Sequence, residues 1–332
     1  MDDVLDRLLA CHSTPGDEGE VAQVLAAAWR EAGWEVVRHG SYAVSACDAA
    51  ARASRPVLLI CSHMDSPGYS VDRPRVAGAG PGKVRFGLTE LGSPEIDGGA
   101  VPAVIKTRQG AFGGTLLDLG DRQGEPDMAF ELKAGEADKA GVRHGDRVCF
   151  SPVRRSEGHL LTAPFLDNRL GCWMLARLAA EARAWQTDFR IVLGATGSEE
   201  MGGFGARVLA AGVRPDLAVV LDTTYEAPEQ GVRLGKGPVL TLSDASVLLS
   251  PEMRDRVLGL MERASVPVQT EVYNFSGTDA KAFPQAGLGC PVLPVLVPTR
   301  GNHSPREEAD ARDFEPWLAA LRAVAEGFEI GW

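Results

Sequence analysis

The feature that most constrains the fold is an interruption in the alternation of strands and helices. Strand- and helix-like segments fill residues 1–68, and regular alternation resumes at 163 and runs to 332. Between them, residues 69–162 lose helical periodicity, and glycine and proline separate short strand-like runs. Alternation is typical of a sheet covered by helices, and short strands with frequent turns are typical of a small barrel. We therefore expect an α/β domain, a mixed sheet sandwiched by helices, with an inserted small all-β barrel domain over residues 69–162.

Hydrophobic periodicity places the individual elements. Asp17 and Glu20 have the spacing of a capping box before a helix that ends near Gly33. The other helices are expected over residues 4–12, 167–184, 202–211, 251–264, 279–283 and 313–328, with a short one at 137–140. Strands are expected over 34–38, 42–46, 56–62, 83–86, 103–107, 111–117, 128–132, 147–151, 189–195, 217–221, 238–243, 268–273 and 291–296.

Composition excludes several classes of protein. The net charge is -11 and no lysine/arginine block is present, which argues against nucleic-acid or anionic-membrane partners. No apolar run approaches the roughly 18 residues of a membrane span. The six cysteines form no Cys-x-x-Cys pair, so we expect free thiols in a reducing compartment. An acidic start that leads into an amphipathic pattern is not a signal peptide, and we expect a cytoplasmic protein.

Three apolar runs end in residue types that can bind metals. The first ends at His63, with Asp65 two residues later; the second leads to Glu199 and Glu200; the third ends at Asp222. Ligands of open α/β sheets lie beyond the carboxyl ends of the strands, so these side chains are expected to meet in one crevice. Each has a plainer interpretation alone: a satisfied histidine, two acids that open a helix, and a turn residue. Their coincidence favours a metal site.

Two further residues would complete such a site. Asp167 precedes a helical stripe, where an N-cap is the usual role, although a capping carboxylate can still offer an oxygen to a metal. His303 lies in a loop bounded by glycine and proline after the strand expected at 291–296. An exposed loop histidine is the alternative interpretation of this residue.

Six motifs together resemble the M42 family, the glutamyl-aminopeptidase-like and TET-type metalloaminopeptidases. They occur in the family's order and approximate spacing over nearly the whole chain. The motifs are Ser62-His63-Met64-Asp65, Leu166-Asp167-Asn168-Arg169-Leu170-Gly171-Cys172, Ser198-Glu199-Glu200-Met201-Gly202, Leu221-Asp222-Thr223-Thr224, Gly277-Thr278-Asp279-Ala280 and Asn302-His303-Ser304-Pro305.

The resemblance implies two divalent metal ions per subunit. On the family pattern His63 and Asp222 hold one ion, Glu200 and His303 hold the other, and Asp167 bridges them. Histidine and carboxylate ligands without thiolate suit Zn²⁺ first, and also Co²⁺ or Mn²⁺.

The resemblance also implies catalytic and substrate-binding roles. Glu199 matches the general base, Asp65 matches the carboxylate that orients the first histidine, and Thr278 and Asp279 are substrate-binding candidates. The implied reaction is hydrolysis at peptide N-termini. A metal-bound hydroxide attacks the carbonyl, and Glu199 accepts the proton and returns it to the leaving amine.

Two other functions stay open. One is a related co-catalytic zinc hydrolase, an N-acyl amino acid deacylase or a carboxypeptidase of the M20 or M28 type; the other is a non-catalytic metal-binding scaffold.

Three departures from the family pattern bear on specificity and assembly. Ser66-Pro67 follows the first motif where an acidic and then an apolar residue are usual, and Asn168 replaces a common second aspartate. The segment 112–132 is shorter than the family's usual insertion. The family assembles dimers into dodecamers through the inserted domain. We therefore expect a homo-oligomer between a dimer and a dodecamer, with the smaller forms favoured by the short insertion.

Overall fold

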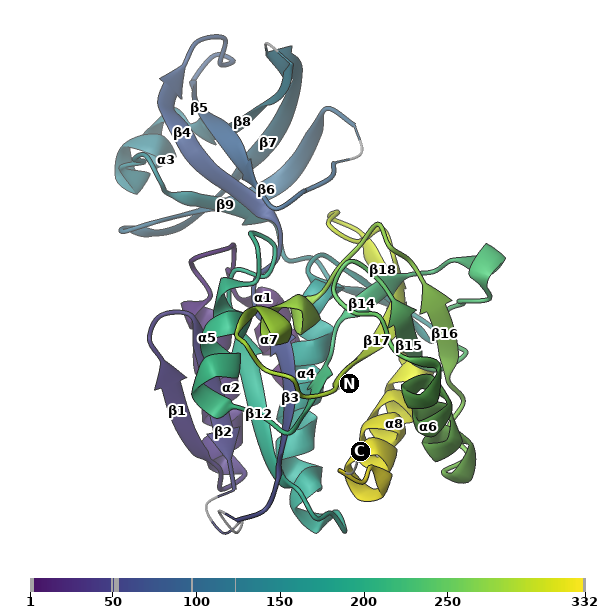
Figure 1. Ribbon diagram of the computed structural model, residues 1–332. Helices are drawn as coiled ribbons and strands as arrows, with labels where there is room; N and C mark the ends of the chain where they lie inside the picture. Colours follow the sequence, from purple (N-terminus) through teal and green to yellow (C-terminus); the bar gives the residue numbers. More distant parts are fainter. Residues whose placement is uncertain (1–2, 49, 51–53, 97, 123, 331–332) are drawn as a thin grey trace.

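The computed structural model describes residues 3–48, 50, 54–96, 98–122 and 124–330. Within these residues the chain forms a 12-stranded sheet covered by helices and a separate closed barrel. Figure 1 shows the barrel at the top of the view and the helix-covered sheet below it. The expected fold class, a mixed α/β sheet with a small all-β barrel, is confirmed.

The sheet is parallel at its centre and antiparallel toward both edges. Its order is β1 (Glu35–His39), β2 (Ala43–Cys47), β12 (Arg190–Thr196), β3 (Val57–His63), β13 (Leu217–Val220), β17 (Val292–Arg300), β18 (Glu307–Asp310), β11 (Leu160–Ala163) and β10 (Arg155–Glu157). Three strands branch from this path near β17: β14 (Thr223–Tyr225), β15 (Val239–Ser243) and β16 (Gln269–Val272). Because β12, β3, β13 and β17 run parallel, their carboxyl ends share one edge.

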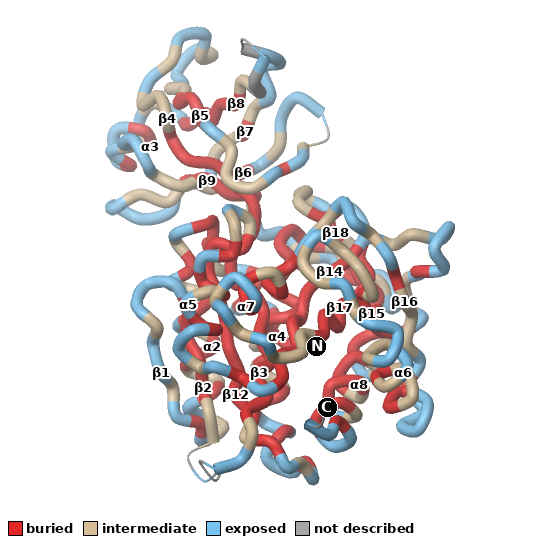
Figure 2. The backbone as a smooth tube through the Cα atoms, viewed as in Figure 1, coloured by how far each residue is buried: buried red, intermediate tan, exposed pale blue. Residues whose placement is uncertain are grey.

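Helices bury both faces of this sheet. One face carries α1 (Asp3–Ala10), α2 (Gly19–Glu31), α4 (Leu166–Glu181), α6 (Pro251–Arg263) and α8 (Phe314–Gly327). The other carries α5 (Phe204–Val213) and α7 (Ala282–Gln285). The central strands are buried along their length, whereas β1 at the edge is exposed (Figure 2). Continuous apolar runs such as Val57-Leu58-Leu59-Ile60 therefore lie where parallel strands are covered on both sides.

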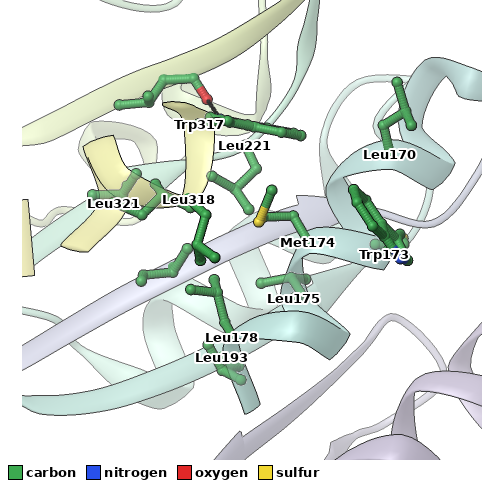
Figure 3. Packing of buried hydrophobic residues seen from close by; sticks show 14 of the residues in the cluster. Leu170, Trp173, Met174, Leu175, Leu178, Leu193, Leu221, Trp317, Leu318 and Leu321 are labelled. Atoms are coloured by element: carbon green, nitrogen blue, oxygen red, sulfur yellow. Dashed lines mark hydrogen bonds between the residues drawn. The ribbon is translucent and has the colours of Figure 1, made fainter. Parts of the chain in front are cut away.

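The largest apolar cluster joins α4 to α8. Figure 3 shows Met174, Leu175 and Leu178 of α4 grouped with Trp317 and Leu318 of α8. The indole N–H of Trp317 donates to the carbonyl of Val295 in β17 over 2.8 Å, so this buried polar group is satisfied. The cluster fixes α4, which carries Asp167 at its start.

The barrel has its own core. It closes in the order β4 (Gly68–Val76), β5 (Lys83–Leu91), β8 (Glu125–Lys133), β7 (Gly110–Arg122), β6 (Ala100–Thr107) and β9 (Arg147–Phe150), and α3 (Ala134–Ala140) follows β8. Tyr69, Phe86, Ile105, Phe130 and Val148 fill its interior. The domain division after residues 68 and 162 stays a prediction. After β9 the chain returns to the large sheet through β10 and β11.

The predicted capping box is wrong. Helix α2 begins at Gly19, its N-cap is Glu18, and no side chain caps it. Asp17 instead binds Lys106 of the barrel strand β6 at 2.9 Å, and it also lies 3.3 Å from His12. Asp17 and Glu20 both pair with Lys106 across the junction between the barrel and the α/β unit, and neither caps the helix.

The strands that sequence analysis missed are mostly short or polar. They are β4, β10, β11, β14 and β18. Three or four residues give too few alternations for a period-two signal, and β4 follows Ser66-Pro67-Gly68, which marks a turn. All six cysteines are free thiols, as expected. Over the described part of the chain, none of the helices has the length and apolar character needed to cross a membrane.

Candidate active site

Four parallel strands place four of the five predicted metal ligands at one edge of the sheet, and the fifth, Asp167, lies at the start of α4. His63 is the last residue of β3, Glu200 follows β12, Asp222 follows β13, and His303 lies in the turn after β17. Three overlapping groups place their ligand atoms within 4.8 Å of one another: His63 with Asp167 and Asp222, His63 with Glu199 and Glu200, and Asp167 with Glu200 and His303. The structure therefore brings all five predicted metal ligands together.

The first half of the site, which we call the sheet-anchored half, consists of His63 and Asp222. The Nδ1 of His63 lies 3.0 Å from the carbonyl oxygen of Asp65, and a carbonyl only accepts, so Nδ1 carries the proton in this bond. The other ring nitrogen, Nε2, lies 3.2 Å from Asp222 Oδ1 and 3.3 Å from Asp167 Oδ1. His63 is 3% exposed.

The second half, which we call the loop-anchored half, consists of Glu200 and His303. Its histidine is oriented in the same way, because Nδ1 lies 3.1 Å from the carbonyl oxygen of Ser93. Its Nε2 lies 3.5 Å from Glu200 Oε1 and 3.7 Å from Asp167 Oδ2. The side chain of His303 is 23% exposed, so this half is the more open of the two.

Asp167 lies between the two halves and offers one oxygen to each. Its Oδ1 is buried and lies 3.3 Å from His63 Nε2, and its Oδ2 accepts from Asn302 at 3.2 Å. Burial opposes ionisation of Asp167, but the hydrogen bond and charge of His63 outweigh burial and hold its pKa at about 2. An ionised, buried carboxylate whose two oxygens each face an imidazole nitrogen fits a bridging ligand of two cations.

The other acids of the cluster resist ionisation without a cation. Burial, with the charges of Asp167 and Glu199, raises the pKa of Asp222 to about 7. Burial and the charge of Asp167 also raise the pKa of Glu200 well above its usual range. Buried charges of one sign are retained when they pair with or coordinate a cation. The donor set therefore fits divalent metals.

Asp65 holds the segment that carries the two adjacent glutamates. Its Oδ1 accepts the backbone N–H of Glu199 and its Oδ2 accepts that of Glu200, each at 3.1 Å. Its carboxylate lies 3.7 Å from His63 Nδ1, farther than its own carbonyl oxygen. The side chain of Glu199, which is not one of the five predicted metal ligands, pairs with Lys281 at 3.3 Å. These contacts give the two glutamates different environments.

The N-cap role expected of Asp167 belongs to Asn168. Although α4 begins at Leu166, Asp167 and Asn168 have non-helical backbone angles, and Asn168 Oδ1 accepts the N–H of Gly171 at 3.0 Å. Its amide nitrogen donates to Asp222 Oδ1 at 3.0 Å. A second aspartate at this position would set a carboxylate against Asp222. The asparagine thus orients Asp222, a predicted metal ligand, and its departure from the family pattern did not reveal this contact.

Two buried acids that sequence analysis missed hold strained backbone beside the site. Ser198 and His303 have positive φ angles of 58° and 68°, which are unfavourable for residues other than glycine. Glu18 accepts the N–H of Ser198 at 2.9 Å, and Glu307 accepts the N–H of His303 at 3.0 Å. Glu307 also accepts the N–H of Asp167 at 2.7 Å. No sequence signal marks a carboxylate whose partners are backbone amides of distant residues.

The substrate-binding candidates are not among the grouped metal-ligand residues. Thr278 is buried and its hydroxyl accepts the N–H of Ala280 as a cap. Asp279 is buried, and its Oδ2 accepts the hydroxyl of Thr196 at 2.5 Å. Burial, together with the charge of Glu199, raises the pKa of Asp279 to about 7. Their role in binding substrate stays a prediction.

Comparison with known proteins agrees with this geometry. A model of the M42 glutamyl aminopeptidase family matches residues 127–319, more than half of the chain. A glutamyl aminopeptidase of Lactococcus lactis is 26% identical over 343 residues, which cover 97% of this chain and 95% of the relative. The chain belongs to the M42 family and is a peptidase.

Solved structures show the same fold. A TET aminopeptidase from a marine-sediment Thaumarchaeota archaeon superimposes with a TM-score of 0.86 at 21% identity, covering 99% of this chain and 97% of that one. The TET1 peptidase of Pyrococcus horikoshii, described as assembling into a tetrahedron or a large octahedral shell, gives a TM-score of 0.81 at 21% identity, covering 98% and 99%. The family and fold that the sequence motifs predicted are confirmed.

Proposed function

We propose that this chain is a two-metal aminopeptidase that removes N-terminal residues from peptides. One observation carries the proposal. Two histidines on opposite sides of Asp167 each have Nδ1 bound to a backbone carbonyl and Nε2 turned toward carboxylates. This arrangement leaves the coordinating nitrogen of each ring unprotonated when a cation is bound.

The proposed ligands follow the two halves. His63 and Asp222 hold one cation, Glu200 and His303 hold the other, and Asp167 contacts both. Bound Zn²⁺, Co²⁺ or Mn²⁺ supplies Lewis acidity that activates a water molecule and polarises the scissile carbonyl. Zn²⁺ is favoured because imidazole and carboxylate ligands suit it well.

Glu199 is the proposed general base. Its carboxylate adjoins the ligand cluster, and Asp65 fixes its backbone through the N–H group. The carboxylate takes a proton from the attacking water and delivers it to the departing amine, so it is regenerated after each turnover. The ammonium of Lys281 lies 3.3 Å from this carboxylate and pairs with it.

A substrate panel tests the proposal. The metal-depleted protein is reloaded with Zn²⁺, Co²⁺ or Mn²⁺ and given peptides with free N-termini, the same peptides N-acetylated, and N-acyl amino acids. Release of the first residue from free peptides alone is expected. Turnover of only the N-acyl amino acids would make the chain a deacylase, and trimming from the other end would make it a carboxypeptidase. Bound metal without turnover of any of these substrates would leave only the scaffold interpretation.

We also propose that the chain forms a homo-oligomer. Support comes from the fold shared with the P. horikoshii TET1 peptidase, which assembles into closed shells. The short barrel insertion favours an assembly smaller than a dodecamer. Light scattering on the purified protein measures the mass directly, and a single 35.3 kDa species would contradict the proposal.

A further inference from the structure

The barrel reaches the active site through the loop between β5 and β6. We call residues 92–96 the site loop. The N–H of Gly92 donates to Met201 Sδ at 3.2 Å, and the N–H of Glu95 donates to the carbonyl of His303 at 2.9 Å. The Ser93 carbonyl accepts from His303 Nδ1 at 3.1 Å. Residues more than 100 positions apart in sequence thus meet at the loop-anchored half.

The contact with Ser93 determines which ring nitrogen of His303 is available to bind a metal. Because the carbonyl accepts, Nδ1 holds the ring proton, and the lone pair of Nε2 faces Glu200 and Asp167. Hydrogen bonds of this kind fix the tautomer and the ring orientation of metal-binding histidines. His63 donates the equivalent bond to the carbonyl of Asp65, two residues away on its own segment, whereas His303 donates it to a carbonyl of the barrel.

Gly92 seats the site loop against the other ligand of this half. Its φ is +74°, and a Cβ added there would lie 3.2 Å from Glu200 Cβ, 3.3 Å from Glu200 Oε2 and 3.3 Å from Pro67 Cβ. Contacts this short require the neighbours to move, and Pro67 is rigid. Any side chain at position 92 therefore displaces Glu200, the loop, or both.

We propose that the site loop consists of positioning residues for the loop-anchored half, so that the barrel controls occupancy of one of the two metal positions. The proposal rests on the proposed two-metal function. Removal of partners that orient metal ligands typically costs about 10–100-fold in metal affinity. The loss should fall on the cation of Glu200 and His303 and spare that of His63 and Asp222.

The test compares Gly92→Ala with Gly98→Ala in the full-length protein. Gly98 lies before β6 in the same connection and has a similar φ of +83°, but a Cβ there meets nothing within 4 Å. Metal-free proteins are titrated with Co²⁺, and its visible absorption spectrum reports the coordination at each step. We expect Gly92→Ala to weaken one of two binding steps by about 10–100-fold and to change its spectrum, with the other step unchanged. Gly98→Ala should match the wild type.

A Gly92→Ala titration identical to that of Gly98→Ala would overturn the proposal, as would equal weakening of both steps. Glu200→Gln separates this failure from failure of the proposed function. If Glu200→Gln weakens one step and Gly92→Ala does not, only the positioning role of the loop is wrong. If Glu200→Gln leaves both steps intact, the two-metal assignment itself is wrong.

A measurement on the wild type covers the case in which Gly92→Ala does not fold. Zinc-loaded protein labelled with ¹⁵N in histidine is studied by NMR, with His303 assigned by its loss in His303→Asn. We expect a proton on Nδ1 that exchanges slowly with water and a metal-bound Nε2. Coordination through Nδ1, or an Nδ1 proton that exchanges as freely as in an exposed histidine, would overturn the proposal.

Discussion

The two halves of the candidate site use the same kinds of ligand but are built differently. His63 is the last residue of a central strand and is 3% exposed, and Asp222 directly follows the neighbouring strand. His303 lies in a turn with a positive φ and a 23% exposed side chain, and a loop from the barrel fixes its ring. The sheet-anchored half is set by strand pairing, and the loop-anchored half depends on contacts between distant segments.

This difference suggests a division of labour. Ligands on regular elements are held more precisely than ligands on loops. The sheet-anchored half should therefore retain its metal more firmly, and the loop-anchored half should exchange its metal and respond to changes in the barrel. The following predictions test this contrast, beginning with the largest effect.

Glu199 belongs to neither pair of ligands, so its loss should separate catalysis from metal binding. We expect Glu199→Gln to lower kcat by about 10²–10⁴-fold, because positioned proton transfer contributes that much, and to keep both metals. Turnover of an aminoacyl anilide and metal content by mass spectrometry measure the two effects. Loss of metal in step with activity would show that Glu199 is a ligand.

Metal removal should be biphasic. With a chelator added to the Co²⁺-loaded protein, we expect one ion to leave at least about 10 times faster than the other. The factor is the lower end of the roughly 10–100-fold effect of partners that orient metal ligands. Glu200→Gln should abolish the fast phase and Asp222→Asn the slow phase, both followed by absorbance. If the assignments of the phases are reversed, the contrast between the halves is wrong.

The junction between barrel and α/β unit should give a pH dependence. Burial disfavours charged His12, but the Cys149 sulfur and the Asp17 carboxylate outweigh burial and raise its pKa from 6.5 to about 9. Charged His12 therefore contributes fully to the stability of the fold below pH 6.5, and this contribution is lost as pH rises through 9. We expect the free energy of unfolding to fall over this window by about 1–2 kcal/mol, because screening at the 31% exposed Asp17 discounts the full shift.

Urea unfolding at fixed metal concentration, between pH 6 and pH 9.5, measures this loss. His12→Gln serves as the comparison, because it keeps a polar side chain of similar size and does not titrate. The variant should lose the slope that the wild type shows. Parallel curves for the two proteins would remove His12 as the cause.

The smallest effect is expected at Lys106, which joins the barrel to α2. Its ammonium lies 2.9 Å from Asp17 and 2.8 Å from Glu20, and all three side chains are partly exposed. Lys106→Met should cost no more than about 1 kcal/mol, and less at high salt. If the barrel positions the loop-anchored half, the fast phase of metal release should accelerate slightly and the slow phase should not. Acceleration of both phases would show that the substitution destabilises the whole protein and not the loop-anchored half alone.

Strand ends and motif order predicted that these side chains gather at one edge of the sheet, as the structure shows. The apolar runs that lead to His63, Glu199 and Asp222 are strong signals because buried parallel strands are continuous in hydrophobicity, and parallel pairing then places their ends together. The barrel was foreseen because glycine and proline punctuate short strands. Residue types and chain order were sufficient for these features.

The features of the site that were not predicted depend on contacts between residues distant in the sequence. Glu18 and Glu307 act through backbone N–H groups, which every residue except proline offers, so their partners leave no trace in the sequence. Asn168 was noted only as a departure from a family pattern, although it both caps α4 and orients Asp222. The approach of Gly92 to Glu200 depends on how the barrel sits on the sheet, which no local pattern encodes.

The connections between barrel and sheet are short. Four residues, 64–67, separate His63 at the end of β3 from Gly68 at the start of β4, and 151–154 separate β9 from β10. Four extended residues span at most about 14 Å. The barrel is therefore tied closely to the sheet, and the first connection begins beside His63, a predicted metal ligand. If the substrates are peptides, as proposed, we expect the space between barrel and sheet, rather than large domain opening, to set the size of chain that is admitted.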